Sequence, residues 1–309
     1  MLACMRRVLL TGVVLGGLCA APGCEQSFQC SPDCLGVPDG DVQSDASLGQ
    51  SRQHITFTTT IDGASYALEA MVYRPQDGNA RHPLVLLTHG RNGPNPTRNP
   101  LEVCGMSPLG EALAARGAIV MMLVRRGYGA SQGPDSEYLE TAEESGFAGA
   151  KDVIAGVEYM RGQPDVDASK MLLMGHSQGG WVTLAASALA ADGVLGAVNL
   201  SGGINFQQEH GKNIRSSLAN EMHMFHSAQI YGVAARVPSL WIYAENDNFR
   251  TDSVRGWLSG FREAGGEATL AVKPAYGSNG HFSTWQPQVI MDDLMAFFAA
   301  RGWKPDGQD

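Results

Sequence analysis

Two serines lie at the centre of a G-x-S-x-G pattern, Ser131 in GASQG and Ser177 in GHSQG. A serine in this pattern can act as a nucleophile at a sharp turn between a strand and a helix, because small neighbours let the two elements pass closely. Both serines follow an apolar run, but the GPD sequence at 133–135 stops any helix after Ser131. The small and apolar residues after Ser177 favour a helix that begins at Gln178. Ser177 is therefore the candidate nucleophile.

Attack by a serine hydroxyl creates a negatively charged oxygen, which two backbone N–H groups commonly stabilise. The helix that begins at Gln178 directs its N-terminal dipole toward this charge, and the Gln178 N–H is one expected donor. The other comes from an upstream loop, and the HGRNG stretch that starts at His89 follows the first long apolar run. We expect the Arg91 N–H to be this donor. A phosphate-binding loop is the rival interpretation, but the stretch lacks the Gly-Lys-Ser/Thr ending.

A serine hydroxyl needs a base that takes its proton during attack. Of the eight histidines, His281 follows the last predicted strand, in the loop GSNGHF, where it can overhang the serine. We expect His281 to be the general base. His176 stands beside the nucleophile and either packs beneath it or contacts the substrate. We expect His54, His82 and His210 to be ordinary surface or core residues.

The base needs an acid that fixes its tautomer and stabilises its protonated form. In the chain order serine, acid, histidine, this acid follows a strand between Ser177 and His281. The segment LWIYAEND ends a predicted strand with Glu245 and Asp247. Asp247 is the preferred acid because it lies just beyond the strand, in the turn before the next helix. Asp252 is interpreted as an acidic residue in the first turn of that helix.

These residues need a scaffold of buried strands, and the sequence predicts one. Two segments at 54–61 and 66–73 flank Asp62-Gly63, which indicates an antiparallel hairpin. After it, short continuous apolar runs alternate with helix-length segments, which is typical of parallel strands joined by crossover helices. The apolar runs are 84–88, 118–124, 171–174, 195–200, 239–244 and 268–272. The helical segments are 108–116, 142–161, 178–191, 251–264 and 286–300. The prediction is a doubly wound α/β fold.

Residues 202–235 break this rhythm, with histidines, phenylalanines and asparagines in mixed order. One interpretation is a cap-like insertion over the carboxyl ends of the strands, where open α/β sheets bind ligands. The other is an ordinary connecting helix. The sequence leaves both open.

The N-terminus indicates export. Arg6 and Arg7 precede an apolar stretch at 8–21, so residues 1–23 are interpreted as a signal peptide. The apolar stretch is too short to span a bilayer stably. The APGC sequence that ends at Cys24 partly matches a lipobox, so Cys24 is a possible site of lipidation and membrane anchoring. Polar residues 24–53 are interpreted as a flexible linker, 54–303 as the catalytic domain and 304–309 as a tail. We expect a periplasmic or extracellular protein.

Composition excludes some classes of function. The 309 residues carry a net charge of −9 and no basic run interleaved with aromatics, so we expect no nucleic-acid partner. No paired C-x-x-C or histidine spacing indicates a metal, and no cofactor is expected. In an oxidising compartment Cys30 and Cys34 could close a small loop, and Cys104 has no obvious partner if Cys24 is lipidated. We interpret four arginines as solvated surface residues, with a local anion site as the alternative. They are Arg91, Arg98, Arg125 and Arg126.

From about His54 to Trp303 the chain resembles the α/β-hydrolase superfamily, and within it the dienelactone hydrolase-like and prolyl oligopeptidase-like esterases. The likeness is carried by HG at 89–90, RRGYG at 125–129, GHSQG at 175–179, YAEND at 243–247 and GHF at 280–282. It implies a mostly parallel sheet with helices on both faces and an antiparallel N-terminal hairpin. It also implies that Tyr128 borders the substrate pocket, with strand-end packing as the alternative.

Dienelactone hydrolases have a cysteine nucleophile where this chain has Ser177, so the resemblance favours general ester hydrolysis of a small-molecule substrate. A serine peptidase of the oligopeptidase type is the first alternative, although we expect the chain to lack room for the propeller domain of such peptidases. A non-catalytic envelope protein with the same fold is the second alternative. The sequence predicts neither the substrate nor the oligomeric state.

Overall fold

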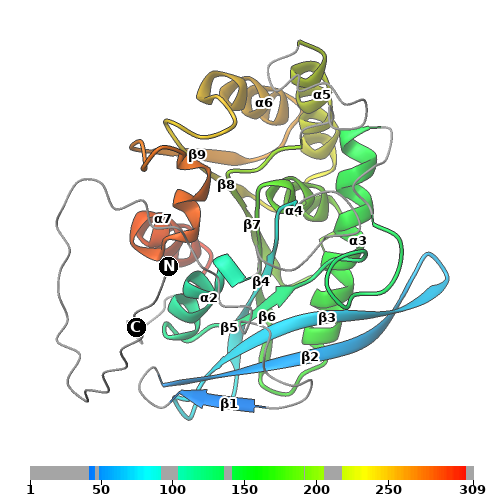
Figure 1. Cartoon of the computed structure of the whole chain (residues 1–309), viewed down its shortest axis with the longest axis vertical. Coiled ribbons are helices and arrows are strands. Elements are labelled where there is room, and N and C mark those ends of the chain that lie inside the picture. Colours follow the sequence, from blue (N-terminus) through cyan, green and yellow to red (C-terminus); the bar gives the residue numbers. More distant parts are fainter. Residues whose placement is uncertain are drawn as a thin grey trace, which may run out of the picture.

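The computed structural model of the chain describes residues 42–45, 49–91, 104–135, 141–190, 192–204 and 218–303. Within these ranges one nine-stranded sheet runs through the molecule in the order β1-β2-β3-β5-β4-β6-β7-β8-β9 (Figure 1). The strands are β1 (Val42–Asp45), β2 (Gln50–Ile61), β3 (Ala64–Pro75), β4 (His82–Thr88), β5 (Ile119–Leu123), β6 (Val166–His176), β7 (Val194–Leu200), β8 (Ser239–Ala244) and β9 (Ala268–Lys273). The helices are α2 (Ser107–Ala114), α3 (Ala142–Arg161), α4 (Gln178–Ala188), α5 (Leu218–Ala234), α6 (Thr251–Glu263), η3 (Gly280–Trp285) and α7 (Pro287–Ala299).

Strands β2 and β3 form the predicted hairpin, which reaches out beyond the helices in Figure 1. Its two turn residues, Asp62 and Gly63, have positive φ angles of 52° and 81°. This combination suits a two-residue turn whose twist matches that of the strands. β3 pairs with β5 antiparallel, and every pairing from β5 through β4 to β9 is parallel. The predicted α/β-hydrolase fold, mostly parallel with an antiparallel hairpin, is therefore confirmed.

The linker predicted over residues 24–53 is wrong at its C-terminal end. Val42–Asp45 forms β1 and pairs antiparallel with β2, which begins at Gln50 and not at His54. Polar residues without apolar alternation, as in this segment, are typical of a linker. Backbone pairing at the sheet edge and the burial of Gln50 and Ser51 order these residues instead. Residues 24–41 and 46–48 lie outside the described residues.

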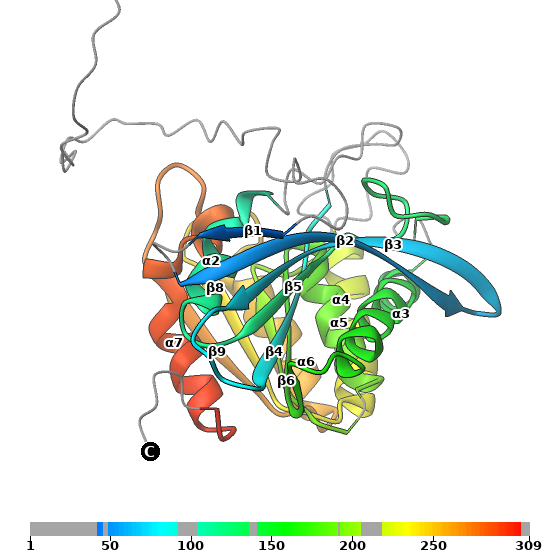
Figure 2. The same ribbon diagram turned by 90° about the horizontal axis from the view of Figure 1, so that it is seen from below.

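The sheet separates two layers of helices, which Figure 2 shows edge-on. Along β4, Leu84 and Leu86 belong to the apolar cluster that includes side chains of α3, α4, α5 and α6. Val85 and Leu87 belong to the cluster on the opposite face, under α2 and α7. Successive side chains of a strand point to opposite faces, so a strand buried on both faces is apolar throughout. This explains the continuous apolar runs of the sequence.

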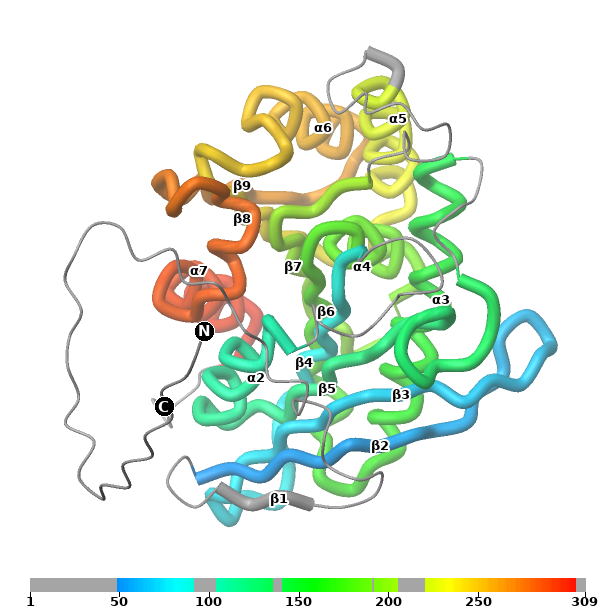
Figure 3. The backbone as a smooth tube through the Cα atoms, in the orientation of Figure 1, coloured from blue at the N-terminus to red at the C-terminus, as the bar shows by residue number. Residues whose placement is uncertain are grey.

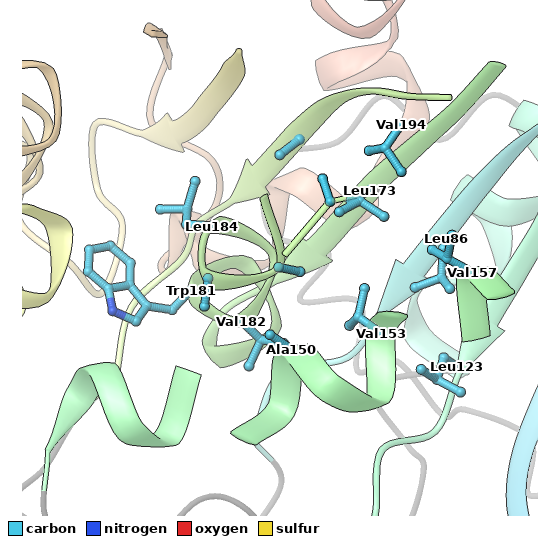
Figure 4. Packing of buried hydrophobic residues seen from close by; sticks show 14 of the residues in the cluster. Leu86, Leu123, Ala150, Val153, Val157, Leu173, Trp181, Val182, Leu184 and Val194 are labelled. Carbon is cyan, nitrogen blue, oxygen red and sulfur yellow. The ribbon is translucent and has the colours of Figure 1, made fainter. Parts of the chain in front are cut away.

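Helices α3 and α4 pack side by side over the first of these faces (Figure 4). Gly156 lets α3 approach β4 closely, because a Cβ there would lie 2.8 Å from Leu86 Cδ1. Trp181 of α4 is fully buried and makes edge-to-face contacts with Tyr231, Trp241 and Trp257. Each such aromatic pair adds about 0.5–1.5 kcal/mol beyond its buried area. The helix that follows the candidate nucleophile is thus fixed firmly to the core.

Residues 202–235 were interpreted either as a cap-like insertion or as a connecting helix, and helix α5 bears on this choice. It follows β7 in the chain and packs beside α6, α3 and α4 (Figure 3). The Tyr231 hydroxyl donates to the Ala142 carbonyl at 2.9 Å, and Trp181 Nε1 donates to Ser227 Oγ at 3.2 Å. Residues 218–234 therefore form the connecting helix between β7 and β8, and 205–217 lie outside the described residues. Of the described helices, none has the length and apolar character required to cross a bilayer.

Candidate active site

Three strand ends bring the predicted triad together. Ser177 follows β6, Asp247 follows β8 and His281 follows β9. These strands are parallel, so their carboxyl ends all lie on the same side of the molecule. Open α/β sheets bind their ligands beyond these carboxyl ends. The topology alone therefore brings residues more than a hundred positions apart in the chain to the same place.

Ser177 stands in a strained turn between β6 and α4. Its φ and ψ angles are 55° and −124°, a region that non-glycine residues seldom adopt. The backbone is held there by β7 and the residues after it, since Ser177 N–H donates to Leu200 O at 2.9 Å and Gly203 N–H donates to Ser177 O at 3.1 Å. The turn presents the serine side chain at the sheet edge.

Glycines around Ser177 are required by close backbone contacts. A Cβ on Gly175 would lie 2.2 Å from Gly179 O, and a Cβ on Gly179 would lie 2.3 Å from His89 O. Any side chain at either position would force the strand, the helix or the loop after β4 to move. The second contact also shows that the loop at 88–90 lies directly against the first turn of α4.

His281 links the serine to the acid. Its Nε2 lies 3.0 Å from Ser177 Oγ and its Nδ1 lies 3.0 Å from Asp247 Oδ1. An ionised carboxylate only accepts hydrogen bonds, so Nδ1 carries the proton and Nε2 is the acceptor for the serine hydroxyl. This is the tautomer that a general base requires.

The loops that carry Asp247 and His281 are tied to each other by Asn246. Its Oδ1 accepts from Tyr276 N–H at 2.9 Å, and its carbonyl oxygen accepts from Gly280 N–H at 3.1 Å. Asn279 Oδ1 then accepts from the His281 N–H at 3.0 Å and starts the short helix η3. The acid and the base therefore keep a fixed separation.

The Asp247 side chain has no exposed surface, and its Oδ1 also accepts from the Phe249 N–H at 3.0 Å. Burial alone would raise the pKa of Asp247, but the hydrogen bond and charge of His281, with smaller effects of Ser201 and Phe249, lower this pKa below its ordinary value. Glu245 is exposed, and the Asp252 side chain is 87% exposed beside Arg250. Of the carboxylates considered from the sequence, the structure brings only Asp247 to His281.

His176 packs beneath the site and has no exposed surface. Its Nε2 lies 3.0 Å from the His281 carbonyl oxygen, and its ring contacts those of His281 and Trp285. Because a carbonyl only accepts, His176 Nε2 donates this hydrogen bond. The structure thus favours packing beneath the nucleophile over substrate contact for His176.

Tyr128 is also buried, with 1% of its surface exposed, and its ring lies edge-on to His89 at 4.4 Å. This is the strand-end packing that the sequence left as the alternative to a substrate contact.

Ser131, the centre of the other G-x-S-x-G pattern, donates through Oγ to Val124 O at 2.6 Å and accepts from Glu69 N–H at 2.9 Å. Both Tyr128 and Ser131 hold the 124–131 loop in place.

The two predicted oxyanion donors come from neighbouring segments. Gln178 is the first residue of α4, and Arg91 is the last described residue of the loop after β4. The contact between Gly179 and the His89 carbonyl places these segments side by side. Their roles as donors stay a prediction.

Several predictions fall elsewhere. Residues 1–23, Cys24, Arg98 and 304–309 lie outside the described residues. Cys104 is disulfide-bonded, and the other cysteines of the sequence all lie at or before residue 34, outside the described ranges. In the part of the chain that the structure describes, no group of three or more metal-binding side chains is found.

Sequence reasoning missed two residues around the triad and misjudged two arginines. Ser201 has a positive φ of 49° and lies beside Asp247, and the Phe249 ring packs 5.7 Å from that of His281. Arg125, interpreted as a surface arginine, is fully buried, and so is most of Arg126. The interpretation of these two arginines was wrong because their buried partners lie far away in the sequence. For Ser201 the position after β7, next to the Ser177 turn, was the available signal.

Comparison with known proteins agrees with this architecture. The sequence model of the prolyl oligopeptidase family matches residues 110–213, whereas no curated protein matches the chain. The acylaminoacyl peptidase of Pyrococcus horikoshii is similar at 20% identity and a TM-score of 0.56, over 84% of this chain and 43% of that one. An esterase of Pyrococcus furiosus is similar at 17% identity and a TM-score of 0.56, over 84% of this chain and 93% of that one.

Acetyl xylan esterase 1 of Thermoanaerobacterium sp. is similar at 16% identity and a TM-score of 0.53, over 84% of this chain and 87% of that one. This chain thus spans less than half of the peptidase and most of the two esterases. At these identities the structures bear on the fold, and the sequence pattern bears on the family. The chain therefore has the α/β-hydrolase fold, and its residues 110–213 match the sequence model of the prolyl oligopeptidase family.

Proposed function

We propose that the protein is a serine hydrolase that cleaves carboxylic esters through an acyl-enzyme intermediate. The observation that carries this proposal is the pair of 3.0 Å contacts from His281 to Ser177 and to Asp247, at a strained turn before a helix. Ser131, by contrast, donates its hydroxyl to the Val124 carbonyl oxygen. The arrangement therefore supports nucleophilic catalysis.

In the proposed reaction, Ser177 Oγ attacks the ester carbonyl carbon while His281 Nε2 takes the hydroxyl proton. The carbonyl oxygen becomes an oxyanion, which accepts hydrogen bonds from the Gln178 and Arg91 N–H groups. When the C–O bond to the alcohol breaks, His281 returns its proton to the leaving alkoxide. Water then attacks the acyl-enzyme with His281 as base, and the carboxylic acid leaves. Asp247 stabilises the protonated His281 in both halves of the reaction.

We propose an ester substrate and not a peptide because the cleavage of an ester requires fewer groups in the active site. Ester cleavage needs a nucleophile, a base and oxyanion donors, and in this proposal these are Ser177, His281 and the N–H groups of Gln178 and Arg91. A peptidase needs in addition groups that bind the extended peptide chain. Phe282 is 37% exposed beside His281, with 5.4 Å between the ring centroids, and gives the site an apolar wall suited to a small ester.

A serine peptidase is the second candidate, and the match of residues 110–213 to the prolyl oligopeptidase family favours it. The triad alone does not distinguish the two substrates, since both react through the same acyl-enzyme chemistry. The substrate assay below separates them.

We also propose that the protein is exported, with a signal peptide at 1–23 and a possible lipid anchor at Cys24. The disulfide at Cys104 supports this location, because disulfides persist in oxidising compartments outside the cytosol. Mass spectrometry of the mature N-terminus tests this proposal. An N-terminus that retains Met1, or an unmodified Cys24 inside a longer mature chain, would contradict export or lipidation respectively.

Labelling with a fluorophosphonate tests the nucleophile. Wild-type protein should be labelled and Ser177→Ala should not, whereas Ser131→Ala serves as the matched control and should be labelled like the wild type. Wild-type protein that resists labelling would favour a non-catalytic binding protein. Esters of increasing acyl length and aminoacyl anilides then give the substrate class, and hydrolysis of anilides without hydrolysis of esters would make the peptidase the better assignment.

A further inference from the structure

Arg125 is buried beneath the loop that follows β4. None of its surface is exposed, and its guanidinium contacts three consecutive residues of that loop. Nη1 donates to Thr88 Oγ1 at 2.9 Å and to the His89 carbonyl oxygen, and Nη2 donates to Gly90 O at 3.5 Å. Burying a guanidinium is costly unless its donors are satisfied. The oxygens of this one loop supply a large part of that compensation.

His89 holds the same loop from within. The Arg125 backbone N–H donates to His89 Nε2 at 3.1 Å, so Nε2 is the unprotonated nitrogen and Nδ1 carries the proton. His89 Nδ1 lies 2.6 Å from Gly90 O and therefore donates to it. The Gly90 carbonyl thus accepts from both His89 and Arg125. Tyr128 contacts both of these side chains and excludes water from them.

The direction of the Gly90 carbonyl fixes the direction of the next N–H. In a trans peptide the C=O of one residue and the N–H of the next point in opposite directions. Two donors on Gly90 O therefore turn the Arg91 N–H away from Arg125. Glycine has no Cβ to restrict its backbone, so without these donors the peptide between Gly90 and Arg91 could rotate at little cost.

We propose that Arg125 is a positioning residue for the oxyanion site. By holding the Gly90 carbonyl together with His89, it keeps the Arg91 N–H directed at the oxygen that becomes charged when Ser177 attacks. This inference rests on the proposed hydrolase function. It assigns a role in orienting the oxyanion donor to Arg125, the first residue of the RRGYG segment at 125–129.

Arg125→Met tests the inference by steady-state kinetics. Loss of one oxyanion donor lowers kcat by about 10²- to 10³-fold, and KM should change little because the donor acts mainly in the transition state. Arg125→Lys, which keeps the charge but reaches fewer of the loop oxygens, should fall between Arg125→Met and the wild type. Methylguanidinium added to Arg125→Ala should restore part of kcat, which replacement of a merely structural side chain would not allow.

Arg126→Met is the matched control. Arg126 is buried next to Arg125 and donates to Asp152 and to the Ala148 carbonyl, with no contact to residues 88–90 in the described interactions. It should lose stability, because a buried ion pair is broken, while kcat for each folded site stays near that of the wild type. End-point fluorophosphonate labelling counts the folded sites in every variant.

Retention of kcat within about threefold of the wild type in Arg125→Met would overturn the inference. If the Arg125 variants do not fold, the wild-type protein still decides. Phosphonylation of Ser177 should move the Arg91 amide proton downfield in NMR spectra, since that N–H would donate to the phosphonyl oxygen, and an unchanged resonance would overturn the inference. Wild-type protein that is neither labelled nor active would instead overturn the proposed function.

Discussion

His176 Nε2 donates to the carbonyl oxygen of His281 at 3.0 Å, a contact between residues 105 positions apart in the chain. His176, the residue before the nucleophile, thus holds the backbone of the base His281 through a hydrogen bond. Neither side chain could be moved without disturbing the other, since their rings also lie 4.8 Å apart. The turn at Ser177 and the loop that carries His281 are therefore joined by direct contacts.

His176→Phe keeps a ring at this position and removes the donor. The free energy of unfolding should fall by about 1–3 kcal/mol, because a buried carbonyl loses its partner. We also expect kcat to fall by up to about 10²-fold, because a small displacement of the base is costly to the reaction. Denaturant unfolding and an ester assay measure the two effects.

His82→Phe is the control for this prediction. His82 is also buried and contacts the Gly117 carbonyl through Nδ1 at 3.2 Å, but it begins β4, at the end of the parallel strands opposite to the triad. The variant should lose stability and keep kcat for each labelled site. Similar losses of kcat in both variants would show that the effect at His176 is general destabilisation and not positioning of His281.

Asp247→Asn should lower kcat by a factor on the order of 10⁴, because the amide cannot stabilise the protonated base or hold its tautomer. Glu245→Gln is the comparison, since Glu245 directly follows β8, two residues before Asp247, but is exposed. It should retain the activity of the wild type. If Glu245→Gln is the more damaging change, the assignment of the acid is wrong.

The pKa of Asp247 predicts how stability depends on pH. Its pKa is lowered in the folded protein, so its contribution to the free energy of unfolding is present above the ordinary pKa of 3.8 and is lost as pH falls through the folded value. The stability difference between wild type and Asp247→Asn should therefore shrink between about pH 5 and pH 2. Urea unfolding at several pH values measures it, and a difference that grows toward low pH would contradict the lowered pKa.

The sequence was sufficient to predict residues that follow from local pattern and chain order. Ser177 could be separated from Ser131 because only Ser177 precedes a helix-forming segment, and His281 and Asp247 follow strands that any parallel sheet brings to one edge. The roles of Arg125 and Phe249 could not be predicted, because each depends on which distant segment packs against it. β1 was missed for a related reason, since a polar edge strand is defined by its backbone partner.

Ser131→Ala should affect stability and leave catalysis intact. The hydroxyl joins Val124 O to Glu69 N–H inside the protein, and its removal leaves both groups without this partner. The cost should be about 1–3 kcal/mol in the free energy of unfolding. Thermal unfolding measures this cost, while fluorophosphonate labelling should match that of the wild type. A loss of labelling with unchanged stability would reverse the roles given to the two G-x-S-x-G motifs.

The disulfide at Cys104 should stabilise the protein. Cys104 precedes Gly105, where a Cβ would lie 2.2 Å from the indole of Trp285, the ring that packs on His176. In the mature chain that we propose, its partner is one of Cys24, Cys30 and Cys34, so the closed loop is long. Peptide mapping without reduction identifies the partner. Because crosslinks over long loops contribute roughly 2–5 kcal/mol, Cys104→Ser and the reduced wild type should both unfold at lower temperature, by similar amounts. Reduction that lowers the melting temperature of Cys104→Ser as much as that of the wild type would assign the stabilisation to another bond.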